Sequence, residues 1–401
     1  MNDRKITVML GLLPFIMVLG NSSLIPILPE IQQNLNLNDT QTSFILSAFS
    51  LPAALAIPFV GILSDRYGRR KLIVLSLMLV ILGSLIAGVS EIVGSQYSYS
   101  LLTVGRIIQG VGAAGTTPLA MALAGDLFSG DRRAKVLGIL EVYNGIGKVI
   151  APIIGAVIAL IAWYALFFLF PLVAIIPLIG VTRYVKEEKQ KSTVSFSTYI
   201  KKLGKVLKRE QRWLYPMFFL GGLCLFLLFG SLYYLSFLIE EKYGIDGFFK
   251  GTSFAIPLGA MTITSYWTGK RIKEDKVLMG KLIIVGITFL ISMFFVMVLF
   301  HSLSVLMFCL TIALGGLGFL LPCINMLVTS SVRDEERGFI VSIYGMVRFI
   351  GVALGPIIFE VWMSDVETMF YYAFMLIVMA SLWVMLRTRI RLPFLRQKVI
   401  R

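Results

Sequence analysis

The sequence predicts an all-α integral membrane protein with twelve transmembrane helices, built as two six-helix halves that are related by a pseudo-two-fold axis. Three observations predict this fold class. Apolar residues make up 57% of the 401 residues and charged residues 15%, whereas soluble domains contain about 45–50% and 25%. Apolar runs long enough to cross a bilayer recur along the chain. The spacing of glycine, proline and arginine in the first half also recurs in the second.

Twelve runs are apolar over the roughly 20 residues that a helix needs to cross the ~30 Å hydrocarbon core of a bilayer. Those of the first half are residues 6–28, 41–63, 72–89, 101–123, 136–160 and 162–181. Those of the second half are residues 213–239, 248–268, 278–300, 303–328, 338–359 and 369–386. The fifth and sixth runs adjoin and are together too long for one span, so a tight turn is expected near residues 159–164.

The basic residues predict which ends of these helices face the cytoplasm, because Lys and Arg concentrate in cytoplasmic loops. With both termini cytoplasmic, 32 of the 37 Lys and Arg residues lie on the cytoplasmic side, and only Lys242 and Lys250 lie in outer loops. Arg106, Lys148 and Arg348 lie inside predicted spans. We therefore expect a multi-pass protein of the plasma membrane with cytoplasmic N- and C-termini. The net charge of +15 marks this orientation and not a nucleic acid-binding face.

A polar interval divides the chain into three parts. They are residues 1–182, the first half; residues 183–212, a cytoplasmic linker; and residues 213–401, the second half with a cytoplasmic tail. Within the linker, apolar residues recur at helical spacing between lysines, a pattern typical of a helix that lies on the anionic inner leaflet. Anionic inner-leaflet lipids are therefore an expected partner, and a solvated linker is the alternative.

An internal repeat supports the division into halves. Shifting the sequence by 204 residues superposes five glycine, proline and arginine positions without a gap, among them Gly147 on Gly351 and Pro152 on Pro356. The same shift places Arg348 at the position of Asn144. Two halves repeated in parallel are a known architecture of membrane transporters.

The loop after the second run carries a motif that reads Gly61-Ile-Leu-Ser-Asp65-Arg66-Tyr-Gly68-Arg69-Arg70. Gly61 permits the close approach of a helix, Gly68 permits a tight turn, and Asp65 can pair with arginines or cap the next helix. The motif resembles the signature loop of the major facilitator superfamily, and this resemblance implies the major facilitator fold. In that family the loop is a cytoplasmic latch that holds the outward-open state, and Asp126 and Arg133 match further positions of the latch.

The fourth run contains a buried-charge motif, Arg106-x-x-Gln109-Gly110-x-Gly112. An arginine within a membrane is costly and usually faces a cavity or a partner. The stretch resembles a motif of the twelve-span drug:proton antiporters, whose arginine is thought to help in proton transfer. The alternative is that Arg106 reaches up to the outer interface.

The fifth run contains Gly147, Pro152 and Gly155, small residues and a proline that let helices pack closely. It resembles the antiporter motif of drug exporters, which is associated with export, although alanines replace two of the motif's glycines. The eleventh run repeats the core of the motif at Gly351, Gly355 and Pro356. The alternative is close packing alone.

Charged and polar residues inside the spans indicate a central cavity. Glu141 and Lys148 lie seven residues apart on one face of a helix, about 10.5 Å from each other, so we expect each to face a cavity or a countercharge. We hypothesise that Asn21, Arg106, Glu141, Asn144, Lys148 and Arg348 line a proton and substrate cavity, with Glu141 taking the proton. A fixed polar lock between the halves is the alternative. Phe226, Tyr233 and Tyr234 form a possible aromatic wall or, alternatively, pack in the core.

The resemblance predicts a proton-coupled secondary transporter that exports small amphipathic or hydrophobic compounds by alternating access. The alternatives are a dedicated exporter of one metabolite, such as a siderophore, peptide antibiotic or lipid, then an uptake symporter or a sensor. The mixed charge of the predicted cavity suggests an anionic or zwitterionic cargo. No nucleotide-binding loop, metal cluster or catalytic triad is found in the sequence, so we expect no enzyme activity and no cofactor beyond the proton gradient. The expected state is a monomer.

Overall fold

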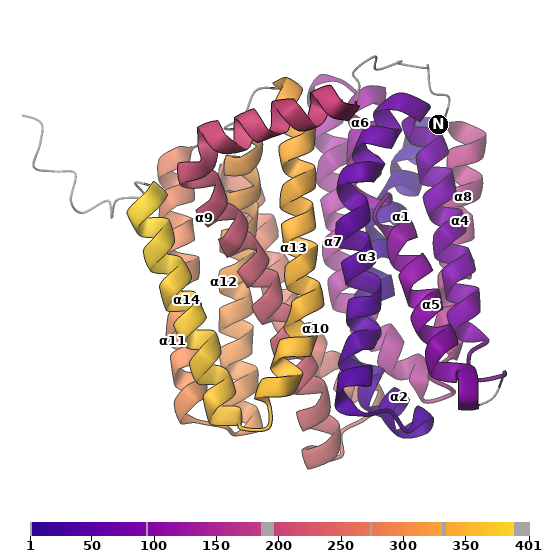
Figure 1. Ribbon diagram of the computed structural model, residues 1–401, viewed down its shortest axis with the longest axis vertical. Helices are drawn as coiled ribbons and strands as arrows, with labels where there is room; N and C mark the ends of the chain where they lie inside the picture. Colours follow the sequence, from indigo (N-terminus) through magenta and orange to yellow (C-terminus); the bar gives the residue numbers. More distant parts are fainter. Residues whose placement is uncertain (1, 94, 186–195, 273–274, 331–333, 389–401) are drawn as a thin grey trace, which may run out of the picture.

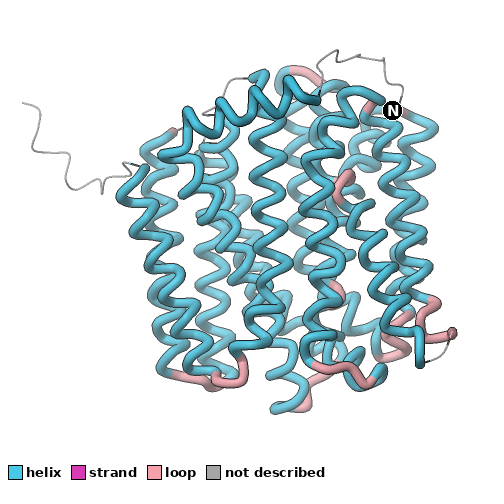
Figure 2. Tube along the Cα trace, in the orientation of Figure 1, coloured by secondary structure: helices cyan, strands magenta, loops and turns pink. Residues whose placement is uncertain are grey.

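The computed structural model describes residues 2–93, 95–185, 196–272, 275–330 and 334–388, and over these residues it contains helices and turns but no β-strand. The helices lie side by side as one bundle (Figures 1 and 2). Those of the first half are α1 (Asn2–Ser22), η1 (Ile25–Ile27), α2 (Leu28–Leu35), α3 (Asp39–Tyr67), α4 (Arg69–Gly88), α5 (Ser95–Ala113), α6 (Thr117–Leu127), α7 (Gly130–Ala159) and α8 (Ala165–Tyr184). Those of the second half are α9 (Phe196–Phe237), η2 (Leu238–Lys242), α10 (Gly247–Ile272), α11 (Lys276–Leu299), α12 (Leu303–Ser330), α13 (Asp334–Trp362) and α14 (Val366–Thr388).

These helices form the twelve predicted spans, two of which are broken. The first span consists of α1, the 3₁₀ turn η1 and α2, and the fourth consists of α5 and α6. Both breaks have a proline at the start of the next element, Pro26 in η1 and Pro118 in α6, because proline lacks the N–H that would continue the helix. The predicted turn between the fifth and sixth spans is confirmed, since α7 ends at Ala159 and α8 begins at Ala165.

The two halves lie next to each other, with the first half coloured from indigo to magenta and pink and the second from red through orange to yellow (Figure 1). Two helix pairs join them: α3 packs against α13, and α7 packs against α10. The N-terminus and the last turn of α14 lie at the same end of the bundle. We call this end the N-terminal end, and the opposite one the outer end, after the orientation that the basic residues predict.

The linker helix and the seventh span form one continuous helix, α9. Figure 1 shows its first turns lying across the N-terminal end of the bundle before the helix turns into the bundle. The predicted helix within the linker is therefore present. Residues 186–195 of the linker lie outside the described residues, and its binding to anionic lipids stays a prediction.

The surface of the bundle matches a lipid environment. Within the described residues, eleven helical segments are long and apolar enough to cross a membrane. The twelfth helix of the bundle, α10, is more polar because it contains several glycines, serines and threonines. Large apolar side chains such as Ile263, 70% exposed, and Leu55, 55% exposed, point outward, which would be unfavourable in water and is favourable against lipid.

One predicted placement is wrong. Lys250, expected in an outer loop, lies in the first turn of α10 and is 1% exposed. The reason is that the first turn of α10 packs against α7 of the first half, where a Cβ on Gly251 would lie 2.7 Å from Ile153 Cα, while Lys250 pairs with Glu240 of η2.

Candidate functional site

Lys148 of α7 lies where the two halves meet, and it is half-buried. It is within electrostatic range of Glu141 on its own helix and of Arg348 on α13 of the other half. Asn144 lies between Glu141 and Lys148 on the same face of α7, one turn from Lys148. The structure therefore brings together four of the six residues predicted to form the cavity. We call Glu141, Asn144, Lys148 and Arg348 the central cluster.

Arg348 is surrounded by polar groups of the second half. Its Nη1 donates to Asn325 Oδ1 of α12 at 3.5 Å, a long hydrogen bond, and its guanidinium lies 5.5 Å from the ring centre of Tyr344. Cys224 of α9 is also within electrostatic range of Arg348. No pattern in the sequence indicated Asn325 or Cys224 as residues of this site. Tyr344 lies one helical turn before Arg348, and that spacing is the one signal that would have indicated it.

Several buried polar atoms of this region have no hydrogen-bond partner within the described part of the chain. They are Asn144 Oδ1, Arg348 Nε and the Tyr344 hydroxyl. Buried polar groups in folded proteins almost always have partners, so each orphaned atom needs an explanation. Asn144 lies one turn from Lys148 and Arg348 lies within electrostatic range of it, and unpartnered polar atoms near a buried charge are expected of a binding site for a polar ligand.

Arg106 of α5 belongs to a separate network. It is 0% exposed, and its Nη1 donates to Gly20 O at 2.7 Å and to Gln109 Oε1 at 2.6 Å. Its Nε donates to Ile45 O at 3.4 Å, and its guanidinium lies 4.4 Å from the ring centre of Phe49. Gly20 lies in the last turn of α1, where backbone carbonyls lose their intrahelical partners. Arg106 thus satisfies a carbonyl exposed by the break in the first span, and it does not reach the outer interface.

Asn21 lies next to the carbonyl that Arg106 binds. Its side chain is 4% exposed, and its Oδ1 has no hydrogen-bond partner within the described residues. The structure places Asn21 and Arg106 together in the first half and outside the central cluster. Their predicted role in the cavity stays a prediction.

The loop between α3 and α4 is held together by ion pairs of the first half. Arg69 contacts Asp126 of α6 at 2.8 Å and Asp65 at 3.6 Å. Arg70 Nη2 donates to Thr182 O of α8 at 2.5 Å, and Gly68 adopts a φ of 101°, which glycine tolerates best.

Other residues of the predicted latch lie nearby. The guanidinium of Arg66 lies 5.5 Å from the ring centre of Tyr67, and that of Arg133 lies beside Gly125. A Cβ on Gly61 would lie 3.2 Å from Ser342 Oγ of α13, so Gly61 is where the motif meets the other half. The structure brings the predicted latch residues together, and their role in the transport cycle stays a prediction.

The antiporter-like motif packs helices in the same way in both halves. A Cβ on Gly155 of α7 would lie 1.9 Å from Ser23 O, and Gly147 faces Phe15 and Val18 of α1. In the second half, a Cβ on Gly351 of α13 would lie 2.1 Å from Gly222 O of α9. Gly355 likewise faces Phe226 O of α9, while Pro152 and Pro356 lie inside α7 and α13. The motif therefore permits the contacts α1–α7 and α9–α13, in agreement with the packing interpretation.

The rings proposed as an aromatic wall pack within the second half. Phe226 contacts Phe359 edge-on at 5.5 Å between ring centres, and Tyr234 contacts Phe370 at 5.6 Å. Tyr233 is 0% exposed and contacts Phe237 at 4.9 Å. Their rings therefore do not face an open cavity in this conformation.

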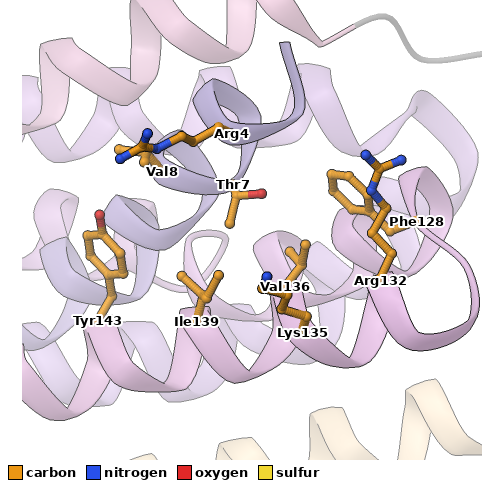
Figure 3. A pocket seen from close by; sticks show the side chains of 9 residues that line it. All are labelled: Arg4, Thr7, Val8, Phe128, Arg132, Lys135, Val136, Ile139 and Tyr143. Carbon is orange, nitrogen blue, oxygen red and sulfur yellow. The ribbon is translucent and has the colours of Figure 1, made fainter. Parts of the chain in front are cut away.

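A cavity of about 450 Å³ opens toward the N-terminal end, between α1 and α7. Figure 3 shows the side chains of α1 facing those of α7 across it. Its lining contains three cations and no carboxylate; the residues are Arg4, Thr7, Val8, Phe128, Arg132, Lys135, Val136, Ile139 and Tyr143. Tyr143 precedes Asn144 in the chain, and its ring lies against Gly11 of α1.

Comparison with known proteins agrees with this architecture. The family model described as Major Facilitator Superfamily matches residues 10–356. The Bacillibactin exporter of Bacillus subtilis (strain 168) is 38% identical over 387 residues, which cover 96% of this chain and 96% of the exporter. Multidrug resistance protein 2 of the same organism is 26% identical over 61% of this chain and 60% of that protein. A solved D-xylose-proton symporter has the same fold, with a TM-score of 0.78 at 15% identity over 96% of this chain and 97% of the symporter.

The matched family and the fold are those of transporters and not of enzymes. The chain is a multi-pass membrane protein and belongs to the Major Facilitator Superfamily.

Proposed function

We propose that this chain exports a small anionic, amphipathic compound by alternating access, using the proton gradient as its energy source. The observation that carries the proposal is the meeting of Lys148 and Arg348 across the two halves with one carboxylate, Glu141, in range. Two cations close together in a medium of low dielectric repel each other strongly. Glu141 compensates one of them, and a bound anion would compensate the other.

Two further observations support an anionic cargo. The cavity at the N-terminal end is lined by Arg4, Arg132 and Lys135, and a cleft lined by one sign of charge attracts ligands of the opposite sign. The relative that matches 96% of the chain is named as a bacillibactin exporter, so bacillibactin is the first compound to test. This agrees with the alternative of a dedicated metabolite exporter.

Broad efflux of drugs is the second candidate function. It is favoured by the similarity to Multidrug resistance protein 2 over 61% of the chain. The two candidates differ in the sign of the cargo, because many membrane-permeant drugs are cations and the central cluster carries a surplus of positive charge.

The test is transport in proteoliposomes with bacillibactin, an anionic dye and a cationic dye, with and without an imposed pH gradient. We expect accumulation of the anions that depends on the gradient. Anion movement that ignores the gradient would contradict proton coupling, and preference for the cationic dye would favour broad efflux.

The variant Glu141→Gln sharpens this test. Removing the negative charge leaves Lys148 and Arg348 uncompensated, so we expect anions to bind about three- to tenfold more tightly, as judged by KM. Glu367→Gln, an exposed acid of α14, is the matched control and should leave KM unchanged. Weaker anion binding in Glu141→Gln would contradict the anionic cargo. Unchanged proton-driven accumulation would exclude Glu141 as the proton acceptor.

A further inference from the structure

Charged residues of both halves meet at the outer end of the bundle. Lys250 of α10 forms an ion pair with Glu240 of η2, and its side chain is 1% exposed. Asp246, in the turn before α10, accepts a hydrogen bond from Gly247 N at 2.6 Å and lies within electrostatic range of Lys250. Glu30 of α2, which belongs to the first half, is within range of all three charges. We call Glu30, Glu240, Asp246 and Lys250 the outer cluster.

The halves are in direct contact around this cluster. Ser236 Oγ of α9 donates to Ile25 O of η1 at 2.7 Å, so a side chain of the second half satisfies a carbonyl at the break in the first span. A Cβ on Gly251 of α10 would lie 2.7 Å from Ile153 Cα of α7. The outer end is thus closed, and opening it must separate Glu30 from the three charges of the second half.

The charge balance of the outer cluster is unfavourable when every group is ionised. Three carboxylates face one ammonium group, which leaves a net charge of −2. The nearby acids of this end, Asp39, Glu241 and Glu360, add further negative charge. Closing the gate brings Glu30 toward Glu240 and Asp246. Glu30 and Glu240 are half-buried, and like charges brought together in a partly desolvated place disfavour the closed state. A proton on Glu30 removes this repulsion and leaves the Lys250–Glu240 pair intact.

We propose that Glu30 is a proton-binding residue of the outer gate, and that the gate closes with a proton bound to Glu30. This inference rests on the proposed function for its place in the cycle, in which an external proton is taken up after the cargo leaves. Glu141 suits that step poorly, because its protonation would hold an anionic cargo in the central cluster and not release it.

The experiment measures the width of the outer gate as a function of pH. Spin labels are placed at Gln33→Cys of α2 and Phe249→Cys of α10, which are exposed, while the native Cys224, Cys309 and Cys323 are buried. Pulsed electron paramagnetic resonance then gives the distance between the labels in nanodiscs from about pH 5.5 to 8.5, where perturbed carboxyl groups titrate.

In the otherwise unchanged protein, we expect the closed population to grow as the pH falls. One proton taken up on closing changes the ratio of closed to open gates by at most about tenfold per pH unit. Glu30→Gln should be closed at every pH, and Glu30→Asp, which keeps the carboxylate, should retain the pH dependence. Glu367→Gln, the charge-matched control at the same end, should behave like the parent.

A pH dependence in Glu30→Gln equal to that of the parent, or no pH dependence in the parent, would overturn the inference. Failure of the proposed function gives a different result. Transport could be independent of the pH gradient while the distance between the labels still depends on pH through Glu30. That result would support proton binding by Glu30 and contradict proton-coupled export. If only the inference fails, transport still depends on the pH gradient, but the Glu30→Gln variant has the same pH-dependent label distance as the parent.

Discussion

Two arginines lie inside membrane spans, and the structure treats them in opposite ways. Arg106 is 0% exposed and donates to two backbone carbonyls and one side-chain amide of the first half, and only its Nη2 lacks a partner among the described residues. Arg348 is half-buried, has one long hydrogen bond to Asn325 at 3.5 Å, and has an Nε without a partner among the described residues. Arg106 thus has three hydrogen bonds where Arg348 has one, and we infer from this difference that Arg106 serves the fold and Arg348 a ligand.

The largest effect is expected for Arg106→Met. The carbonyls of Gly20 and Ile45 and the amide of Gln109 would lose a buried donor, and each buried polar group left without a partner costs about 1–3 kcal/mol. We expect the free energy of unfolding to fall by about 3 kcal/mol or more, with a lower yield of folded protein. The measurement is the thermal unfolding midpoint in detergent. A stable Arg106→Met protein that has lost only transport would break the comparison, because Arg106 would then serve the ligand.

A smaller effect, confined to transport, is expected for Arg348→Gln and Lys148→Gln. Each variant removes one cation from the central cluster but retains a polar side chain, so the unfolding midpoint should change little. KM for an anion should rise about tenfold, the equivalent of one charge-assisted hydrogen bond of about 1.4 kcal/mol. Lys270→Gln, an exposed lysine at the end of α10, is the matched control. If Arg348→Gln and Lys148→Gln have the same KM for anions as the control Lys270→Gln, the central cluster is a structural lock.

The smallest effect is expected for Tyr344→Phe. The hydroxyl group of Tyr344 is buried and has no partner within the described part of the chain, so its removal should leave stability unchanged or raise it slightly. If a ligand supplies the missing partner, KM should rise about two- to fivefold, as expected for one neutral hydrogen bond. A clear loss of stability would instead show that the hydroxyl group has a structural partner in the folded protein.

The sequence predicted the elements of the fold well, because membrane helices leave a strong signal. The turn between the fifth and sixth spans, the linker helix and the repeat of Gly147 at Gly351 are all present. The central cluster was also predicted in part. Glu141, Asn144 and Lys148 share a face at helical spacing, and the repeat placed Arg348 opposite Asn144. These predictions needed only helical periodicity and the high cost of a charge in lipid.

Contacts between distant segments were beyond the sequence. Nothing in the spacing separates Arg106 from the central cluster, since the carbonyl that it binds is exposed by a break in another helix. The sequence predicts Lys250 in an outer loop. In the structure its side chain is buried against Glu240 and lies near Glu30, 220 residues earlier in the chain. The outer cluster exists only because α2, η2 and α10 converge at one end of the bundle.

The sequence by itself thus determined the spans, the division into halves, the repeat and the family motif, since each of these is local or periodic. The tertiary structure decided which partners each buried charge has. It places Arg106 in the packing of the first half. It also brings Lys148 near Arg348, and Glu30 near Lys250, across the interface between the halves. The physical reason is that the energy of a buried charge depends on the partners that folding brings within a few ångströms, and these partners come from other helices.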